Sequence, residues 1–323
     1  MPDTAIECRD LAKSFGRSRP ALPALQGVSF TVARASVCAL LGHNGAGKTT
    51  TINILSTLVR PTAGSARVAG FDVERQPAEV RASIGVTGQS AALDEFLTGR
   101  ENLTLFGQLR GLRHRSARRR ADELIGRFDM GHAADRRVST YSGGMRRRID
   151  IAVALVVPPR VLFLDEPTTG LDPRSRRDVW DLVSALRDQN VTVLLTTQYL
   201  EEADVLSDSI IVLDSGRVVA SGTADDLKRR VGVSYCQVTP ADPIDLAEIA
   251  TALADFAGCG TDCGALIDQQ AGAVSVPAPD GIVTFGEVFR RLDRLGIELA
   301  DISLRKPSLD EAFLDLTSPA VTV

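Results

Sequence analysis

The chain has 323 residues, a net charge of −4, a pI of about 5.5 and 44% hydrophobic residues. Its apolar content is that of a globular protein with a sizeable core, which excludes a wholly disordered chain. The acidic balance argues against a protein that works by holding a phosphate backbone, so we expect no nucleic-acid partner.

The N-terminal segment, MPDTAIECRD, lacks the basic start and the apolar run of a secretory signal. No apolar run in the sequence reaches the ~18–20 residues that a membrane span requires. The five cysteines stand at 8, 38, 236, 259 and 263, without the neighbouring ligands of a metal site. We therefore expect a cytoplasmic chain without a disulfide scaffold or a structural zinc ion, and with at most a peripheral place at a membrane.

A buried strand is predicted at 36–42, and the sequence GHNGAGKTT follows it directly. This sequence fits G-x-x-x-x-G-K-[ST], in which glycines let backbone N–H groups surround a polyphosphate and a helix directs its positive end at it. The lysine reaches the β- and γ-phosphates and the next hydroxyl binds Mg²⁺. The predicted nucleotide-binding residues of this phosphate cradle are Gly42, Asn44, Gly45, Gly47, Lys48, Thr49 and Thr50.

Residues 91–157 are rich in arginine and have helical periodicity without a clear strand, which predicts an inserted helical subdomain. The basic run RHRSARRR at 113–120 is interpreted as a solvated helix face. Within the same stretch, YSGGMRRRIDIAVAL predicts a helix that begins just after Gly143 and Gly144, with Ser142 at its start. That start either binds an anion or is a plain N-terminal cap.

Two further buried strands are predicted at 160–166 and 191–197. The first carries Asp165 to its C-terminal end, where ligands bind in parallel sheets, with Glu166 beside it. An acidic metal holder and a base that orients water are what a phosphate cradle requires in addition. The second strand ends at Gln198, where the sequence becomes acidic and helical. Residues 210–222 then predict a hairpin that turns at Ser215 and Gly216.

The alternation of strands and helices predicts an α/β domain with a largely parallel sheet over residues 1–230. From residue 231 the composition changes, and strand and helix patterns alternate again on a smaller scale. We expect a small C-terminal α+β domain at 231–323. Its last helix carries a capping box formed by Ser308 and Glu311.

The order of these motifs resembles the ATP-binding subunits of ABC transporters, over about residues 5–225. SGGM at 142–145 is similar to the signature sequence of that family, which usually ends in glutamine. The resemblance implies that the family's P-loop NTPase fold is present, and that Lys48 has a catalytic role. It implies further nucleotide contacts by Phe15, Gln89, Ser142, Gly143, Gly144 and Asp172, with Phe15 stacking on adenine, and it implies metal binding by Thr49, Gln89 and Asp165.

Three further segments resemble the daunorubicin/doxorubicin-resistance type of these subunits: DEFLTGRENL (94–103), TTQYLEEAD (196–204) and PSLDEAFLDLT (307–317). Most members of the wider family have histidine at the position of Gln198. An amide can donate hydrogen bonds to a γ-phosphate but does not exchange a proton near pH 7. We therefore expect Gln198 to sense the phosphate and Glu166 to carry the acid–base chemistry.

The resemblance implies a subunit that binds and hydrolyses ATP with Mg²⁺ and energises an exporter of drugs or other hydrophobic compounds. It implies a separate multi-span permease, a homodimer that closes on ATP within a two-plus-two complex, and a peripheral place at the cytoplasmic face of the cell membrane. Two alternatives stay open from the sequence. One is a soluble ABC-type ATPase that acts on the ribosome or DNA, and the other is a nucleotide-gated regulatory module.

Overall fold

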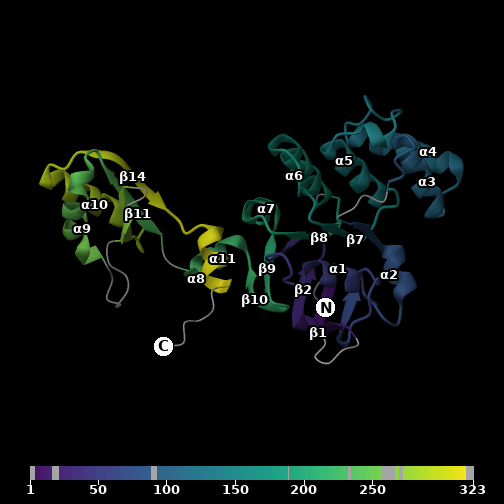
Figure 1. The fold of residues 1–323 in the computed structure, drawn as a ribbon, viewed down its shortest axis with the longest axis horizontal. Coiled ribbons are helices and arrows are strands. Elements are labelled where there is room, and N and C mark those ends of the chain that lie inside the picture. Colours follow the sequence, from purple (N-terminus) through teal and green to yellow (C-terminus); the bar gives the residue numbers. More distant parts are fainter. Residues whose placement is uncertain are drawn as a thin grey trace. The chain divides into compact units, whose positions relative to one another are not determined.

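The computed structural model describes residues 4–16, 22–88, 93–187, 189–231, 234–256, 266–268 and 272–317 (Figure 1). The chain forms two compact units, Met1–Ala224 and Asp225–Val323, each described by itself below. The division at residue 224 precedes the position expected from the sequence, residue 230. Gln89, Cys259 and Cys263 lie outside the described residues.

The first unit is built on a six-stranded sheet with the strand order β10-β9-β3-β8-β7-β6. Its strands run parallel except for β10, which pairs antiparallel with β9. The three predicted buried strands and the predicted hairpin are confirmed within one residue of their ends. The strands are β3 (Val37–Leu41), β6 (Ile84–Thr87), β7 (Val161–Asp165), β8 (Thr192–Thr197), β9 (Ser209–Asp214) and β10 (Arg217–Gly222).

A second, antiparallel sheet in this unit has the order β2-β1-β4-β5. Helix α1 (Lys48–Leu55) contacts β2 and β4 of this sheet and β7 of the other, so it lies between the two. Ile52 and Leu55 of α1 join Phe163 of β7 in one apolar core, where each large side chain contributes about 1.5–3 kcal/mol by burial. The strands are β1 (Thr4–Phe15), β2 (Leu22–Ala33), β4 (Ala63–Val68) and β5 (Phe71–Asp72).

Helices α6 (Pro173–Arg187) and α7 (Leu200–Leu206) lie on the opposite side of the six-stranded sheet from α1 (Figure 1). Helix α6 contacts β8, and α7 contacts β3 and β8. Buried apolar side chains on α6, such as Val179 and Val183, recur at helical spacing and fix the face that it presents to the sheet. The short helix α2 (Pro77–Ser83) precedes β6.

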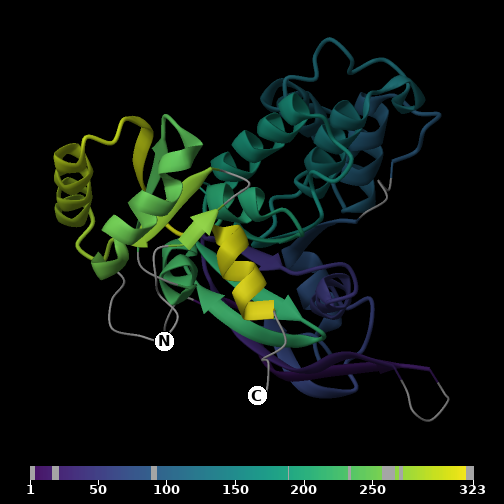
Figure 2. The same ribbon diagram turned by 60° about the vertical axis from the view of Figure 1, so that its left-hand side comes forward.

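The described part of 91–157 contains helices α3 (Gly99–Leu109), α4 (His114–Arg127) and α5 (Gly143–Ala154), and a 3₁₀ turn, η1 (Val138–Thr140). These helices form a group beside the sheet that can be followed in both ribbon views (Figures 1 and 2). Thr98 and Glu101 make a complete capping box at the start of α3, which explains why the helix begins there. Helix α5 contacts both α3 and β6, and so connects this group to the sheet.

The second unit contains a four-stranded antiparallel sheet with the order β12-β13-β11-β14. Its core joins side chains of β11 and β13 to side chains of α9 and α10, so both helices cover the same face. The predicted capping box of Ser308 and Glu311 is confirmed by both of its hydrogen bonds. The elements are α8 (Ala224–Val231), β11 (Tyr235–Pro240), η2 (Pro243–Asp245), α9 (Leu246–Ala252), η3 (Ala254–Phe256), β12 (Leu266–Asp268), β13 (Ala273–Pro277), α10 (Ile282–Leu295), β14 (Leu299–Arg305) and α11 (Leu309–Thr317).

Candidate nucleotide-binding site

The predicted phosphate cradle is a turn between β3 and α1. Gly45 and Gly47 have φ angles of +88° and +107°, which side chains other than glycine rarely adopt. A Cβ atom on Gly42 would lie 2.4 Å from the carbonyl oxygen of Leu213, and one on Gly47 would lie 2.7 Å from that of Ala24. The loop therefore requires glycine both for its conformation and for its close packing. Helix α1 begins at Lys48, so its positive end faces this loop.

Lys48 is almost fully buried, and its ammonium group is held at the cradle. Its Nζ atom donates hydrogen bonds to the carbonyl oxygens of Gly42 at 2.8 Å and of His43 at 3.2 Å. The same nitrogen lies 3.5 Å from Oε1 of Glu166. A positive charge is thus fixed between the loop and the acidic end of β7, where a bound phosphate chain requires it.

Asp165 and Thr49 meet across the site although they are far apart in the sequence. The Thr49 hydroxyl donates to Oδ1 of Asp165 at 3.3 Å, and the Thr196 hydroxyl donates to the same oxygen at 2.5 Å. Thr196 is fully buried at the end of β8 and fixes the carboxylate. The parallel strands β7 and β8 therefore place these groups together at their C-terminal ends.

Glu166 follows β7 in an unusual backbone conformation. Its φ angle is +46°, which is uncommon for a side chain of this size, and the next residue, Pro167, disfavours helical backbone angles before it. The Glu166 N–H donates to both the carbonyl oxygen and the hydroxyl of Thr196, at 3.2 and 2.9 Å. Oε2 of its carboxylate accepts from the Thr169 hydroxyl at 3.3 Å. The surrounding structure thus holds the carboxylate toward Lys48.

The SGGM segment forms the start of α5. Ser142 is the N-terminal cap and its Oγ accepts from the Met145 N–H at 3.3 Å, as the sequence predicted. Gly143 and Gly144 belong to the first turn of the helix and do not precede it, which corrects the expected helix start. Ser142 and Gly143 are exposed, so the N–H groups of this helix start remain accessible to an anion.

Gly144 packs directly against the start of α6. A Cβ atom there would lie 2.4 Å from Oγ of Ser175, so only glycine fits. Ser175 in turn belongs to the cap that Asp172 forms: Oδ1 of Asp172 accepts from the N–H groups of Arg174 and Ser175, both at 3.0 Å. These hydrogen bonds, first of all that from the Ser175 N–H, lower the pKa of Asp172. The signature segment and the GLD segment that contains Asp172 therefore form one continuous surface.

Residues 25–169 match the ABC transporter family. The chain is 53% identical over 316 residues to the doxorubicin resistance ATP-binding protein DrrA of Mycobacterium tuberculosis, with 98% of this chain and 94% of that protein covered. It is also 50% identical over 317 residues to the daunorubicin resistance ATP-binding protein DrrA2 of Streptomyces coeruleorubidus, with 98% and 96% covered. The chain is an ABC transporter ATP-binding subunit of the drug-resistance type.

Solved structures agree with this assignment. An ATP-binding subunit of an ABC transporter superposes with a TM-score of 0.62 at 30% identity, and covers 70% of this chain and 92% of its own. The dimeric structure of MJ0796, a bacterial ABC transporter cassette, gives a TM-score of 0.62 at 25% identity, with 68% and 98% covered. The chain therefore has the fold of ABC ATPases, binds ATP and is an ATPase, as expected from the sequence.

Three further site residues predicted for the ATP-binding subunit are Phe15, Thr50 and Gln198. Phe15, at the end of β1, is 45% exposed, and Nζ of Lys13 lies 5.1 Å from its ring centroid. This exposure leaves the ring free to stack on a base. Gln198 is half-buried between β8 and α7, and Thr50 is half-buried in the first turn of α1. Their roles stay predictions, as does that of Gln89.

His43 and Asn44 lie exposed in the cradle loop of the ATP-binding subunit. The His43 ring forms two hydrogen bonds of 2.7 Å. One joins Nδ1 to the carbonyl oxygen of Asn44, and the other joins Nε2 to Oδ1 of Asp214. No role for His43 was expected from the sequence. The structure places it as a link between the cradle loop and the hairpin formed by β9 and β10.

Glu202 is a buried acid near the site that the sequence did not single out. Its Oε1 accepts from the Thr168 hydroxyl at 2.9 Å and from the Trp180 indole at 3.2 Å. Burial raises the pKa of Glu202. In the sequence, Glu202 is marked only by its neighbour Glu201. Because both lie in a helix, their side chains point in different directions, and only Glu202 is buried. Glu202 joins α7, which follows Gln198, to the loop after β7.

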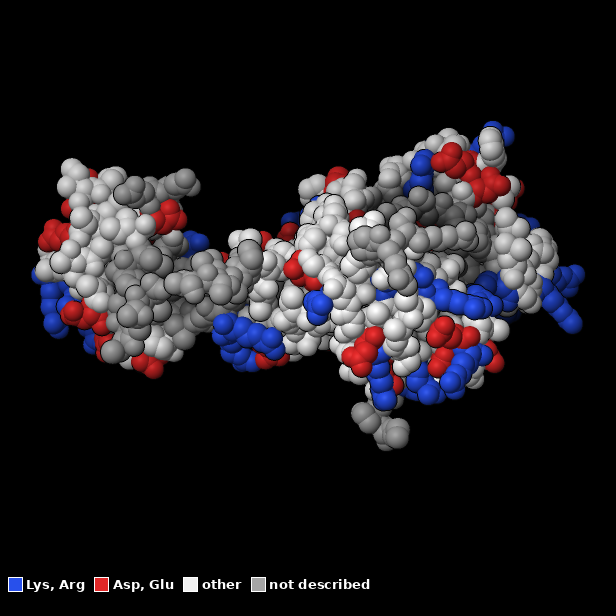
Figure 3. Space-filling view, turned by 60° about the horizontal axis from the view of Figure 1, so that its bottom comes forward, with Lys and Arg blue, Asp and Glu red and all other residues white. Residues whose placement is uncertain are grey.

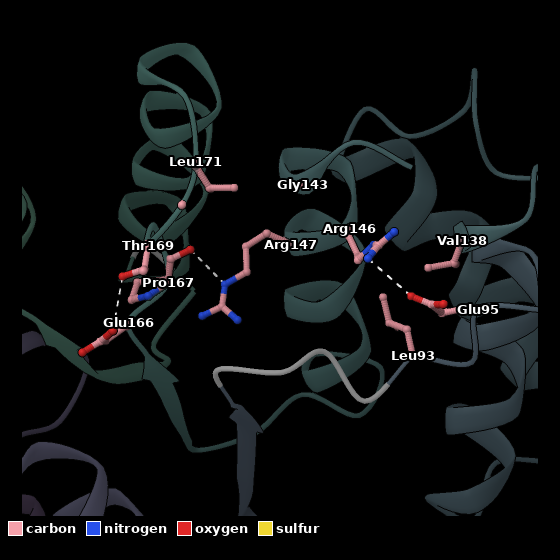
Figure 4. A pocket seen from close by; sticks show the side chains of 11 residues that line it. Leu93, Glu95, Val138, Gly143, Arg146, Arg147, Glu166, Pro167, Thr169 and Leu171 are labelled. Atoms are coloured by element: carbon pink, nitrogen blue, oxygen red, sulfur yellow. Dashed lines mark hydrogen bonds and ion pairs between the residues drawn. The ribbon is translucent and has the colours of Figure 1, made fainter. Parts of the chain in front are cut away.

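A cavity of about 530 Å³ lies between α5 and the loop after β7 (Figure 4). Arg146 and Arg147 reach into it from α5, and Glu166 and Thr169 line it from the other side. The remaining lining residues are Leu93, Glu95, Val138, Gly143, Pro167, Gly170 and Leu171. This cavity connects the signature helix with the loop that carries Glu166.

Proposed function

We propose that this subunit hydrolyses ATP as one half of a homodimer and thereby drives a separate membrane permease that exports hydrophobic drugs. The observation that carries the proposal is the convergence of Lys48, Thr49, Asp165 and Glu166 around the cradle. The relatives named for doxorubicin and daunorubicin resistance support compounds of that kind as the exported substrates.

Phosphoryl transfer to water requires mainly positioning and neutralisation of charge. In the proposed reaction, the N–H groups of the cradle and the Lys48 ammonium bind the phosphates. Glu166 orients and polarises the attacking water. Gln198 donates a hydrogen bond to the γ-phosphate, a role that requires no proton exchange.

The residues present fit a magnesium ion bound with the nucleotide. The Thr49 hydroxyl and the Asp165 carboxylate are oxygen ligands of the kind that Mg²⁺ prefers, and their hydrogen bond brings them together. No group of three or more His, Cys, Asp or Glu side chains arranged for a metal occurs among the described residues. This agrees with an ion that is held mainly by phosphate and water and that would neutralise charge on the phosphates. Gln89 remains a proposed ligand as well.

A second copy of the chain would complete the site. The exposed helix start at Ser142 and Gly143 presents N–H groups and the positive end of a 12-residue helix. We propose that it binds the γ-phosphate of ATP held in the cradle of the partner, with Asp172 beside it. Two chains arranged head to tail would then enclose two nucleotides and pair with two membrane subunits.

The membrane partner is proposed to be a separate multi-span protein. None of the helices in the described ranges has both the length and the apolar character of a membrane span. The helical group within 91–157 would receive the movement of dimer closure and pass it to the permease. The subunit would therefore work at the cytoplasmic face of the cell membrane as a peripheral protein.

We propose that the domain at 231–323 stabilises or regulates the dimer. It has a core of its own, formed by its sheet with α9 and α10. Removal of residues 231–323 should weaken self-association, measured by sedimentation at several protein concentrations. Unchanged self-association would exclude the stabilising role.

A nucleotide-gated regulatory module is the second candidate, and Gln198 favours it because a histidine is the usual residue at that place. In the view of Figure 3, basic and acidic side chains form neighbouring patches, so the described residues of this face present mixed charge, and not a uniformly basic surface, to a phosphate backbone. Measured turnover of ATP distinguishes the ATPase subunit from the regulatory module.

The test of the proposed function is Mg²⁺-dependent ATP turnover as a function of protein concentration, for the purified chain and for membranes that contain its co-purifying partner. The rate of ATP turnover should increase more than linearly with protein concentration, because two chains form each site. Glu166→Gln should lower it about 10²–10⁴-fold, the usual contribution of a general base. Co-purification of a ribosome, or turnover that survives Glu166→Gln, would overturn the proposal. Gln198→Ala should lower kcat as well, and unchanged hydrolysis in this variant would exclude the sensing role.

A further inference from the structure

Arg147, the fifth residue of helix α5, makes an unusual set of contacts. Its guanidinium is largely buried, with 11% of the side chain exposed. Nε donates to the carbonyl oxygen of Pro167 at 2.9 Å, and Nη2 donates to that of Asp165 at 3.1 Å. The two accepting carbonyls belong to the residues on either side of Glu166. Figure 4 shows the side chain extending from α5 toward Pro167.

The remaining contacts of this guanidinium fix its place. Nη1 donates to Oδ2 of Asp150 at 3.0 Å, one turn along α5, and to the carbonyl oxygen of Gly88 at 3.0 Å. Gly88 directly precedes Gln89, the residue that the family resemblance assigns to metal binding. One planar cation therefore joins the signature helix, the end of the Gln89 segment and the loop after β7. A guanidinium suits this task because its donors form a rigid fork.

The backbone at Glu166 requires such support. A left-handed conformation in a residue that precedes proline is sparsely populated, and such conformations persist where the surrounding structure determines them. Thr196 holds the Glu166 N–H from the side of β8. Arg147 holds the flanking carbonyls from the side of α5. The backbone that orients the Glu166 carboxylate is thus held by hydrogen bonds from Thr196 on one side and from Arg147 on the other.

We propose that Arg147 is a positioning residue for hydrolysis: by holding the carbonyls of Asp165 and Pro167, it makes the orientation of Glu166 depend on the place of helix α5. Helix α5 begins at the signature segment. A movement of α5 on binding of that segment to a second chain would therefore be transmitted to Glu166 by the Arg147 side chain. The inference rests on the proposed role of Glu166 as the base.

The decisive variant is Arg147→Lys, which keeps a positive charge beside Asp150 but removes the fork. A misplaced catalytic group lowers the rate by up to about 100-fold, so kcat should fall about 10- to 100-fold. The KM for ATP should stay within about twofold, since a group needed only for the transition state changes kcat and leaves binding intact. Because misfolded protein would also lower the apparent kcat without changing KM, kcat is calculated from the concentration of ATP-binding sites titrated in each variant.

Arg120→Lys is the matched control. Arg120 also donates to two carbonyl oxygens, those of Leu155 and Val156, and pairs with an acid three residues along its helix, Glu123. It contacts the opposite end of α5 and not the loop that carries Glu166. Its substitution should leave kcat and KM at parental values, although it removes bonds of the same kind.

Hydrogen exchange gives a second readout that does not depend on turnover. In Arg147→Lys, amide exchange in the peptide that covers 161–172 should become faster, while Arg120→Lys should leave it unchanged. If Arg147→Lys loses soluble protein, Asp150→Asn takes its place, with a smaller fall in kcat expected in the same direction. Asp150→Asn leaves Arg147 in the chain but removes the charge that orients it.

The outcomes separate this inference from the proposed function. A parent without turnover, or turnover that survives Glu166→Gln, would overturn the proposed function. A parent that hydrolyses ATP together with an Arg147→Lys variant of equal kcat would overturn the inference alone. Parallel changes of kcat and KM in Arg147→Lys would also overturn it.

Discussion

Replacement of Gly47 by alanine tests how strictly the phosphate cradle depends on glycine. Gly47 has a φ angle of +107°, and an added Cβ would lie 2.7 Å from both the carbonyl oxygen of Ala24 and Cδ2 of Leu25. A left-handed conformation costs an L-residue about 1–2 kcal/mol. Forcing an extra carbon into a packed site adds about 1–3 kcal/mol. We expect the free energy of unfolding to fall by about 2–5 kcal/mol in Gly47→Ala.

Gly45→Ala is the control for the backbone part of this cost. Gly45 has a φ angle of +88°, but its added Cβ would have no atom within 4 Å. Only the conformational cost of about 1–2 kcal/mol applies there. The difference between the two variants therefore measures the contact with β2.

Urea unfolding followed by fluorescence of Trp180 measures both variants. Trp180 is the single tryptophan of the chain and is buried on α6, so its signal reports on the ATP-binding unit. The midpoint should fall in both variants and further in Gly47→Ala. Equal losses in the two variants, or a loss below about 1 kcal/mol in Gly47→Ala, would refute this account of the cradle.

Three further predictions concern buried groups. Burial raises the pKa of Glu202, so its stabilising contribution is lost as the pH rises above 4.5 and through its folded-state pKa. Glu202→Gln should therefore lessen the fall of the melting temperature with rising pH, and an equal difference between variant and parent at every pH would contradict this. Burial raises the pKa of Cys38 to about 12, so iodoacetamide at pH 8 should label it only after unfolding, as mass spectrometry will detect; rapid labelling of the folded chain would be inconsistent. Phe163→Ala should destabilise by about 3–5 kcal/mol in urea, and a loss below about 1 kcal/mol would mean that β7 is not the core strand described.

The sequence predicted β3, β7 and β8 well because each is a short apolar run buried on both faces. The parallel strand β6 was not predicted, since it is only four residues long and Val86 in it is exposed. The 215–216 turn was also predicted, and the φ angles of +47° at Ser215 and +76° at Gly216 explain why a serine–glycine pair occurs there. The antiparallel sheet of β1 and β2 was not predicted. Its register shifts, as between Cys8 and Leu11, break the regular alternation of buried and exposed residues by which such strands are recognised.

The site residues of the cradle could be predicted because their chemistry requires fixed residue types at fixed spacing. The contacts of Arg147 could not, since three of its four acceptors are backbone carbonyls, which carry no signal in the sequence. The role of Thr196 in holding Asp165 was also missed, because a threonine at the end of a β-strand is ordinary there. Sequence reasoning thus found the groups proposed to touch the nucleotide and missed the groups that hold them.

The distance of 3.5 Å between Lys48 and Glu166 has a consequence for the order of events. A phosphate that binds the Lys48 ammonium competes with the Glu166 carboxylate for the same positive charge. If Glu166 is the base, as proposed, arrival of the substrate therefore weakens its ion pair with Lys48 when the nucleotide is in place. The lysine proposed to bind the phosphates of ATP also pairs with the carboxylate proposed to activate water. In the empty cradle this carboxylate is therefore held by Lys48.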